Sequence, residues 1–362
     1  MKNRRNVHLF GIVVIIAVIG FTMIACKGRS GNDNTFDPVA QIGETTYTTL
    51  QEAVDAAEES DTITILKDIT LTEPVTVTIT KGFGGITIDL NGNTLDGGSG
   101  TAIQHNGTGI LGITDSTGGG RSTGTVTAST AGFAVDTVII NGGCLIVSGD
   151  AMIKSVGSGK SIYNDGGEIW VTEDSTVLAI SGGIAIMNNG YGTVIVEGGA
   201  VGSIGDGGLA IVNTVGTVTV LDGAVYSDDD NSFTIMNTNE CIVNIGGGSI
   251  RCDGDNSYAV FNYGGTITIG GGTIRNNNAR EGVAISNELG GGTITITVDE
   301  PSLPYSAPIT VIGGTSAFDI APAVSATGVK VTASANTDGS QEASYNAANI
   351  GTYKYVRFEE GL

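Results

Sequence analysis

The side chains with the clearest capacity for chemistry are carboxylates that recur at a fixed interval. The spacing from Asp228 to Asp253 equals that from Asp230 to Asp255, and Asp206 lies about one such interval earlier. If the chain repeats with that interval, these carboxylates lie in the same loop of adjacent repeats. Such a ridge offers the oxygen ligands that Ca²⁺ takes. The alternative is a solvated acidic edge that keeps the protein soluble, and the sequence leaves both open.

Six asparagines recur at almost the same interval and predict a structural array. Each follows a short apolar segment such as Ala259-Val260-Phe261. Asparagine tolerates the left-handed backbone of a sharp bend, and its amide is both donor and acceptor. Aligned copies can therefore bond one to the next along a stack. We predict such a ladder, with a row of sugar-binding amides as the alternative, at Asn164, Asn188, Asn213, Asn237, Asn262 and Asn287.

The repeat predicts the fold that must position these residues. Each unit holds an alternating segment such as Thr266-Ile267-Thr268-Ile269, a Gly-Gly turn and a second short strand. Leucine-rich repeats have a similar period, but residues 161–298 hold only four leucines. The pattern instead predicts an all-β protein, a parallel β-helix whose short strands each pair with their equivalents about 4.8 Å away. Residues 62–312 give room for about ten coils of 24–25 residues.

Composition agrees with this fold and excludes other classes of protein. Glycine accounts for 58 of the 362 residues, which suits many tight turns and weakens any long helix. The 37 acidic and 16 basic residues give a formal net charge of −21. A nucleic-acid partner is not expected, because binding one requires a cationic surface. The same negative balance argues against adsorption to anionic lipid through a basic patch.

The two ends of the stack carry patterns of their own. Thr49-Leu50-Gln51-Glu52 is a capping box, and apolar residues at helical spacing follow it to about Glu59. We predict a short helix that covers the open end of the core, with a surface helix lacking that role as the alternative. Alternating segments over 329–332 and 353–358 are expected to close the other end. The predicted domains are a β-helix with its cap over 44–312 and a C-terminal coil and β cap over 313–362.

The first residues are expected to form a targeting signal rather than part of the fold. Lys2, Arg4 and Arg5 precede an apolar run over 9–24, which ends at Ala25-Cys26. This pattern is typical of a bacterial lipoprotein signal over 1–25, after which Cys26 is lipidated. An uncleaved anchor helix and a simple secretory signal are the alternatives. Residues 26–43 would form a flexible tether, and we expect lipid anchoring in the cell envelope, at the outer membrane or cell surface, with a periplasmic face also open.

Three cysteines remain besides Cys26, namely Cys144, Cys241 and Cys252. An odd number permits at most one disulfide. A bond between Cys241 and Cys252 and a pair of buried thiols both stay open. No CxxC or Cys/His cluster occurs, so zinc is not expected, and Ca²⁺ is the only cofactor considered.

Several stretches resemble a known fold family. Tyr47 and residues 49–57, 61–66 and 88–95 are similar to the opening of pectin-lyase-like right-handed β-helix proteins. The repeat over 259–274 resembles the coils of adhesin-like bacterial surface proteins in that group. The resemblance covers most of the mature chain and implies a right-handed helix. It implies little about function, because this fold hosts lyases, glycosidases and non-enzymatic surface proteins alike.

The resemblance also implies catalytic motifs that can be compared with this chain. Polygalacturonase-like members carry Asn-Thr-Asp, Asp-Asp, Gly-His-Gly and Arg-Ile-Lys, whereas His105 stands in Gln-His-Asn-Gly and residues 228–230 have no partner motif. Lyase-like members use bound Ca²⁺ and an Arg or Lys base, but Arg251, Arg275 and Arg280 lie in no recognisable lyase motif. We therefore predict no catalytic residue, and we expect His105 in a turn or on the surface.

These patterns together predict a non-enzymatic, monomeric lipoprotein that presents a β-helix surface to a glycan or a protein, as an adhesin-like module. Two alternatives stay open. One is a polysaccharide lyase or glycoside hydrolase acting on acidic polysaccharide. The other is a structural spacer of the envelope.

Overall fold

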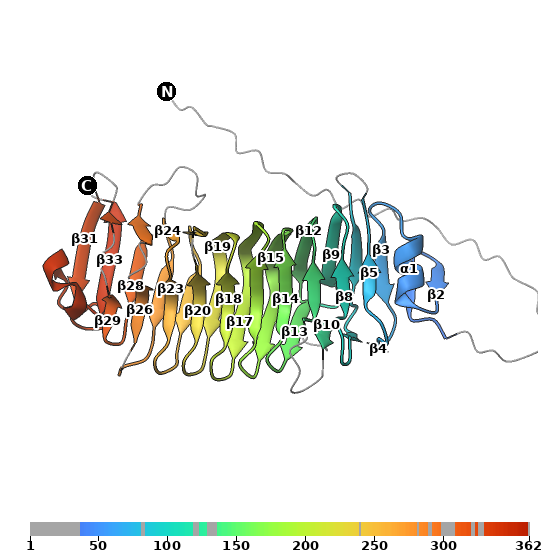
Figure 1. The fold of residues 1–362 in the computed structure, drawn as a ribbon, viewed down its shortest axis with the longest axis horizontal. Helices are drawn as coiled ribbons and strands as arrows, with labels where there is room; N and C mark the ends of the chain where they lie inside the picture. The colour runs from blue at the N-terminus through green and yellow to red at the C-terminus, as the bar shows by residue number, and fades with distance from the viewer. Residues whose placement is uncertain are drawn as a thin grey trace, which may run out of the picture. The chain divides into compact units, whose positions relative to one another are not determined.

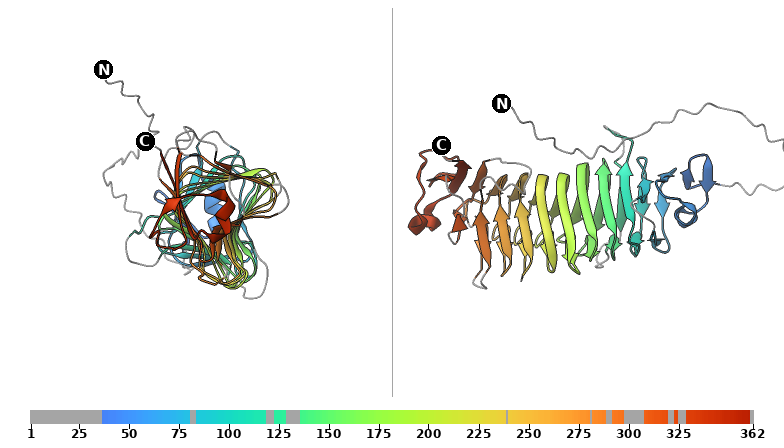
Figure 2. Two further views of the ribbon diagram at one scale, coloured as in Figure 1. Left: turned by 90° about the vertical axis from the view of Figure 1, so that its left-hand side faces the viewer. Right: turned by 90° about the horizontal axis from the view of Figure 1, so that it is seen from above.

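The computed structural model describes residues 37–80, 84–118, 123–128, 136–238, 240–280, 282–288, 292–297, 308–319, 323–324 and 329–360. These residues form an all-β solenoid of about nine turns with very little helix. Figure 1 shows the coils following one another in chain order, and Figure 2 shows them superposed in the end-on view. The predicted parallel β-helix is confirmed. The predicted signal segment over 1–25 and Cys26 lie outside the described residues, among which no helix is long and apolar enough to cross a membrane.

The count of about nine turns is slightly below the expected ten, because two coils are long. The middle coils keep a nearly constant step, as between the register partners Ile162 and Ile186. Ile103 and Val138 are also register partners, but more chain separates them. The step from Val283 to its partner Ser316 is lengthened in the same way. Because these two coils contain more residues than the others, the same length of chain forms fewer turns.

One side of every coil belongs to a ten-stranded parallel sheet, here called the ladder sheet. In a strand such as Phe233–Asn237, the first and fourth side chains face outward and the third and fifth are buried. Its strands, in order, are β5 (Val75–Val77), β8 (Ile103–His105), β11 (Val138–Ile140), β14 (Lys160–Asp165), β16 (Ile184–Asn189), β18 (Leu209–Asn213), β20 (Phe233–Asn237), β23 (Tyr258–Asn262), β26 (Val283–Asn287) and β29 (Ser316–Phe318).

The rest of each coil belongs to a larger sheet with two parallel arms. The first arm follows the ladder sheet in the chain and contains β3 (Thr62–Ile65), β6 (Ile86–Asp89), β9 (Ile110–Asp115), β12 (Cys144–Gly149), the beginnings of β15 (Glu168–Ile180), β17 (Gly192–Ile204) and β19 (Gly216–Ser227), then β21 (Ile242–Ile245), β24 (Thr266–Ile269), β27 (Thr293–Ile296) and β30 (Ala323–Val324). The second arm contains β4 (Ile69–Thr70), β7 (Thr94–Asp96), β10 (Thr125–Ala128), β13 (Met152–Val156), the ends of β15, β17 and β19, then β22 (Ser249–Cys252), β25 (Thr273–Asn276) and β28 (Ile309–Ile312). Valine and isoleucine at alternate positions of both arms fill the core.

A short helix, α1 (Leu50–Ala56), packs at the first coil, and its capping box is present. The Thr49 hydroxyl accepts a hydrogen bond from the Glu52 amide at 3.2 Å, and the Glu52 carboxylate accepts one from the Thr49 amide at 3.2 Å. The Gln51 side chain accepts from the amide of Thr76 at 2.8 Å and donates to its carbonyl at 3.0 Å. Gln51 thereby supplies to the edge strand β5 the bonds that a neighbouring strand would make.

The N-terminal boundary differs from the expected tether over 26–43. Residues Ala40–Ile42 form β1, which pairs antiparallel with β2 (Thr45–Tyr47) and with β3. Gly43 has a φ of +55°, which lets the chain reverse between β1 and β2. The ordered part of the chain thus begins earlier than composition suggested, because a glycine-rich stretch can also make a hairpin.

Parallel pairing continues past residue 312 through β29 and β30. Antiparallel strands then follow, namely β31 (Val329–Ser334), β32 (Ala343–Ser344) and β33 (Tyr355–Glu360), with the 3-10 helix η1 (Ala347–Thr352) before the last. Strand β33 pairs with β28 and with β31. The rings of Phe318 and Phe358 meet edge to face, with centroids 6.3 Å apart. The last coil is therefore closed by antiparallel strands that cannot continue the stack.

Candidate functional site

The six asparagines lie at the ends of consecutive ladder-sheet strands and form one continuous chain of hydrogen bonds. The side-chain nitrogen of each donates to the side-chain oxygen of the next, at 2.8–3.0 Å, through Asn164, Asn188, Asn213, Asn237, Asn262 and Asn287. The first five are fully buried. Each also donates to a carbonyl of the turn that follows it, as Asn188 does to Gly192 at 2.9 Å. Burial and mutual bonding leave no amide of these five exposed to a sugar.

Glycines beside the ladder are required by its close packing. A side chain at Gly192 would overlap the amides of Asn164 and Asn188, and one at Gly292 would overlap those of Asn262 and Asn287. The ladder asparagines themselves have ordinary negative φ, so the left-handed backbone expected for them is wrong. The bend is instead made by the residues that follow, including Gly216 at φ +146°.

The carboxylates predicted as a ridge follow the second arm in adjacent coils, and each accepts a hydrogen bond from another coil. Asp206 accepts from the Asn231 amide at 2.9 Å, and Asp230 accepts from the backbone amide of Asp255 at 2.7 Å. Asp255 in turn accepts from the Asn278 side chain. These bonds give the acidic ridge a structural role in joining coils.

Arg251 lies between the carboxylates of Asp228 and Asp253. Its guanidinium donates to Asp228 at 2.8 Å and to Asp253 at 2.5 Å. Burial raises the pKa of Asp228 above its usual range, although the Arg251 charge opposes this rise and the Asp253 charge adds to it. Burial and the Asp228 charge likewise raise the pKa of Tyr226. The guanidinium lies 5.5 Å from the centre of the Tyr226 ring, so all four side chains form one contact network.

A second, shorter ladder runs beside this network, and sequence reasoning missed it. The side chains of Asp206, Asn231 and Asn256 bond in series, at 2.9 and 3.0 Å. Asn231 and Asn256 have φ of +54° and +51°, the left-handed conformation that asparagine tolerates. The signal was present as Asp-Asn-Ser at 230–232 and again at 255–257.

The ridge does not gather its carboxylates around one point. Among the described residues, no group of three His, Cys, Asp or Glu side chains is arranged to hold a metal ion. The donors already bonded to Asp206, Asp230, Asp253 and Asp255 would have to move before these groups met a cation. Calcium binding at this ridge stays a prediction.

The second arm aligns an aromatic ring with two arginines. Tyr226 is the register partner of Arg251, which is the partner of Arg275. The Tyr226 ring covers Gly202 of the preceding strand, where a side chain would overlap it. Arg275 is exposed, as is Arg280 in the loop after β25. We call Tyr226, Arg251 and Arg275 the arginine row; its groups can stack on and donate hydrogen bonds to a polar ligand.

His105 is fully buried at the end of β8, so its expected place in a turn or on the surface is wrong. It is the register partner of Ile140, which is the partner of Asn164. Its Nδ1 lies 3.3 Å from the Val77 carbonyl and its Nε2 lies 3.0 Å from that of Gly109. The imidazole therefore extends the ladder column and faces backbone carbonyls rather than solvent.

The three cysteines of the solenoid are thiols, so no bond joins Cys241 to Cys252. Cys252 is buried, and its sulfur accepts a hydrogen bond from the Ser227 hydroxyl at 3.2 Å. Burial raises its pKa. Burial, with the Glu168 charge, raises the pKa of Cys144 to about 11. Neither thiol is suited to act as a nucleophile at neutral pH.

Two further carboxylates, Asp89 and Asp115, are buried near the first coils and were not singled out from the sequence. Asp115 accepts bonds from Gly92, Thr117 and Gly124, the shortest from Gly124 at 2.6 Å. Burial would raise its pKa, yet these bonds hold it below the usual range. Its surroundings are backbone amides and a hydroxyl, which makes Asp115 a fixed ionised anchor.

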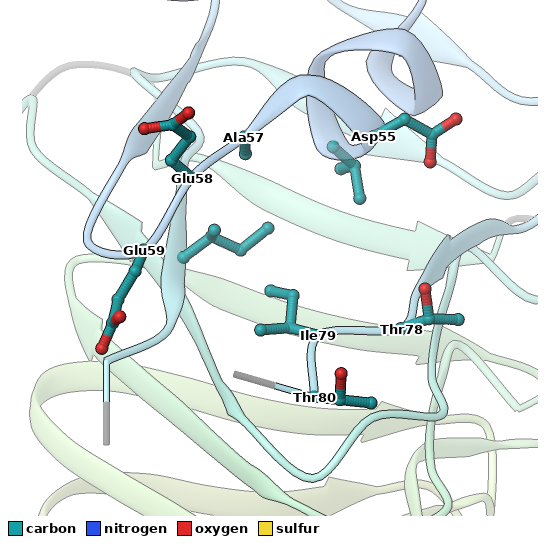
Figure 3. Close-up of a pocket in the computed structure, with 9 residues that line it drawn as sticks. Asp55, Ala57, Glu58, Glu59, Thr78, Ile79 and Thr80 are labelled. Carbon is teal, nitrogen blue, oxygen red and sulfur yellow. The ribbon is translucent and has the colours of Figure 1, made fainter. Parts of the chain in front are cut away.

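A cavity of about 230 Å³ lies between α1 and the first coils. Figure 3 shows Ile79 directed toward its centre, while the carboxylates of Asp55 and Glu58 point away from it. Glu59 accepts a hydrogen bond from the Gly84 amide at 2.8 Å. The cavity is lined by polar as well as apolar side chains, Thr78 and Thr80 among them, but the carboxylates of Asp55 and Glu58 do not converge in it, and it supports no specific chemistry.

Comparison with known proteins gives no match to a family model, a curated protein or a solved structure. The arrangement of the side chains is thus the basis for a functional proposal.

Proposed function

We propose that the protein is a non-enzymatic lipoprotein of the cell envelope that binds a glycan through the second arm of its large sheet. The observation that carries the proposal is the arginine row, aligned in register beside the acidic ridge. Aromatic rings, guanidinium groups, carboxylates and amides are the groups that contact and hydrogen-bond sugars. Because the row follows the stack of coils, an extended glycan can contact several coils at once.

The charges beside the row favour a neutral glycan. Arg251 is already paired with Asp228 and Asp253. Asp206, Asp230 and Asp255 add further negative charge along the same loops. A polyanionic chain would be repelled at short range, whereas hydroxyl groups can donate to the carboxylates and accept from the arginines.

Anchoring through a lipid on Cys26 belongs to the same proposal, as does the likeness of the coils to pectin-lyase-like and adhesin-like surface proteins. The lipoprotein pattern of the first residues supports the anchor. A tether between lipid and solenoid would let the second arm meet a glycan outside the membrane.

A panel of neutral and acidic polysaccharides tests the binding part. Residues 37–362 form a compact unit with both ends capped, so this segment is the material to use. We expect binding to at least one neutral glycan, weakened about tenfold or more, equivalent to about 1.4 kcal/mol, by Tyr226→Ala or Arg275→Ala. Thr219→Ala, on the outer side of the first arm, is the matched control. Absence of binding, as a pure spacer would show, or equal binding by all variants would contradict the proposal.

A second candidate is a polysaccharide lyase or hydrolase. It is favoured by one observation, the exposed Arg275 aligned with Arg251 and its two carboxylate partners. Cleavage that depends on Arg275 would distinguish this enzyme from a binding protein.

A further inference from the structure

The outer side of the ladder sheet is an apolar face of two rows, which stacking in register creates. Across β14 to β26, ten of the twelve positions on this side hold apolar or aromatic side chains, and Lys160 is the only charged one. Nine of these ten are partly exposed, whereas Val212 is buried, as is Ser286. The first row is Lys160, Ile184, Leu209, Phe233, Tyr258 and Val283; the second is Tyr163, Met187, Val212, Met236, Phe261 and Ser286. Parallel sheets with both sides apolar are normally covered on both.

The bulky side chains are divided unequally along this face. Aromatic rings gather on β20 and β23, where Phe233 and Tyr258 stack with centroids 5.7 Å apart and planes at 12°. Phe261 adds a third ring, whose centroid lies 4.8 Å from that of Phe233. Smaller aliphatic side chains occupy β16 and β18, among them Ile184 and Leu209. The side chains on β20 and β23 therefore project further from the sheet than those on β16 and β18.

We propose that a second copy of this chain covers the apolar face. Phe233 and Tyr258 turn their ring faces toward each other, which leaves them poorly placed to stack on sugar rings. An anionic membrane is disfavoured by the net charge of −21. A contiguous apolar patch in an otherwise charged protein is typical of a protein interface, and identical copies most often meet through a two-fold axis.

A two-fold axis parallel to the strands, between β18 and β20, makes the face self-complementary. It places Phe233 against Leu209 of the other copy, Tyr258 against Ile184, and Phe261 against Met187. Large side chains then meet smaller ones at each of these positions, as in a well-packed core.

The same axis also brings the charged groups at the ends of the face near one another. Lys160 of each copy, which pairs with Asp136 of its own copy at 2.9 Å, approaches the β26 end of the other. There the exposed Asp319 accepts a hydrogen bond from Ser286.

The dimensions indicate a reversible dimer. Six strands spaced about 4.8 Å apart span about 24 Å, and five residues of strand span about 17 Å. The flat footprint is thus about 400 Å² per copy, roughly half of a standard interface. Repulsion between two copies of charge −21 also weakens association at low salt and is screened at high salt.

Sedimentation velocity of residues 37–362 tests the proposal, over concentrations from about 1 µM to about 1 mM. We expect a monomer–dimer equilibrium that tightens between about 0.1 M and about 1 M salt. Met187→Glu and Phe261→Lys should each weaken it about tenfold or more. The double variant should return to within about threefold of the wild type, because the new charges face each other across the axis. Within one copy, positions 187 and 261 are three strand spacings apart, about 14 Å, too far to pair.

Thr266→Glu, exposed on the first arm, is the matched control and should leave the equilibrium unchanged. The melting curve of each variant checks its fold, and Leu209→Glu replaces any variant that does not fold. A wild type that stays monomeric throughout, single variants that associate normally, or a double variant no better than the singles would each overturn the proposal.

Failure of this dimer proposal is distinct from failure of glycan binding, which concerns the second arm and is measured on the polysaccharide panel. The proposal departs from the monomer expected from the sequence, because the two rows appear only when coils are stacked in register.

Discussion

Removal of one central ladder asparagine should destabilise the solenoid strongly. In Asn213→Ala, the side-chain oxygen of Asn237 loses its donor and one amide hydrogen of Asn188 loses its acceptor. Both groups are fully buried. A buried polar group left without a partner costs about 1–3 kcal/mol, so we expect the free energy of unfolding to fall by about 2–6 kcal/mol.

Asn287→Ala provides the matched comparison at the end of the ladder. Asn287 is only partly buried, and removing its side chain takes an acceptor from one ladder asparagine, Asn262, while no further ladder asparagine loses its donor. We therefore expect a loss of about 1 kcal/mol. Both variants can be unfolded in urea and followed by far-UV circular dichroism and by the fluorescence of Trp170, the single tryptophan. A central variant within about 0.5 kcal/mol of the wild type, or no worse than the terminal one, would refute the ladder as a stabilising element.

Two further predictions concern the ends of the fold and its response to acid. Gln51→Leu removes both hydrogen bonds to the Thr76 backbone, and we expect the free energy of unfolding to fall by about 1–3 kcal/mol. The edge of β5 is then open, so the variant should aggregate and scatter more light. Unchanged scattering would refute the capping role of Gln51. The pKa of Asp115 is lower in the folded protein than its ordinary value of about 3.8 in the unfolded chain. Its ionised carboxylate therefore stabilises the fold above that ordinary value, and this stabilisation is lost as the pH falls through the pKa of the folded state. Asp115→Asn should therefore flatten the fall in melting temperature between about pH 5 and pH 1, unlike the exposed Asp174→Asn; parallel curves for Asp115→Asn and wild type would contradict this.

Most of the fold could be predicted from the spacing of the sequence repeat. The asparagines at 164–287 and the alternating valines and isoleucines specify both the strands and their register, since each coil repeats the same local choices. The capping box at Thr49 and Glu52 equally specifies α1. Coil number was less predictable, because loops such as the one between Ile103 and Val138 lengthen a coil without changing the pattern of its strands.

Features that depend on neighbouring coils were harder to predict. His105 looked like a surface residue because it is polar and precedes Asn-Gly, but its register column runs into the ladder. The network of Arg251 with Asp228 and Asp253 joins residues of two adjacent coils. The apolar face likewise requires the register of six strands. Such properties arise from stacking, and no single repeat contains them.

The most direct test of the central claim follows the fate of a glycan while it is bound. Residues 37–362 can be incubated with a polysaccharide that the protein retains, and new reducing ends are recorded while it is bound. A uronate-containing polysaccharide is incubated in parallel, and there the ultraviolet absorbance of unsaturated uronates is recorded as well. We predict retention of the glycan with neither product, and loss of retention in Tyr226→Ala and Arg275→Ala. Steady release of products by the wild type, abolished in Arg275→Ala, would contradict the account and identify the second arm as an active site.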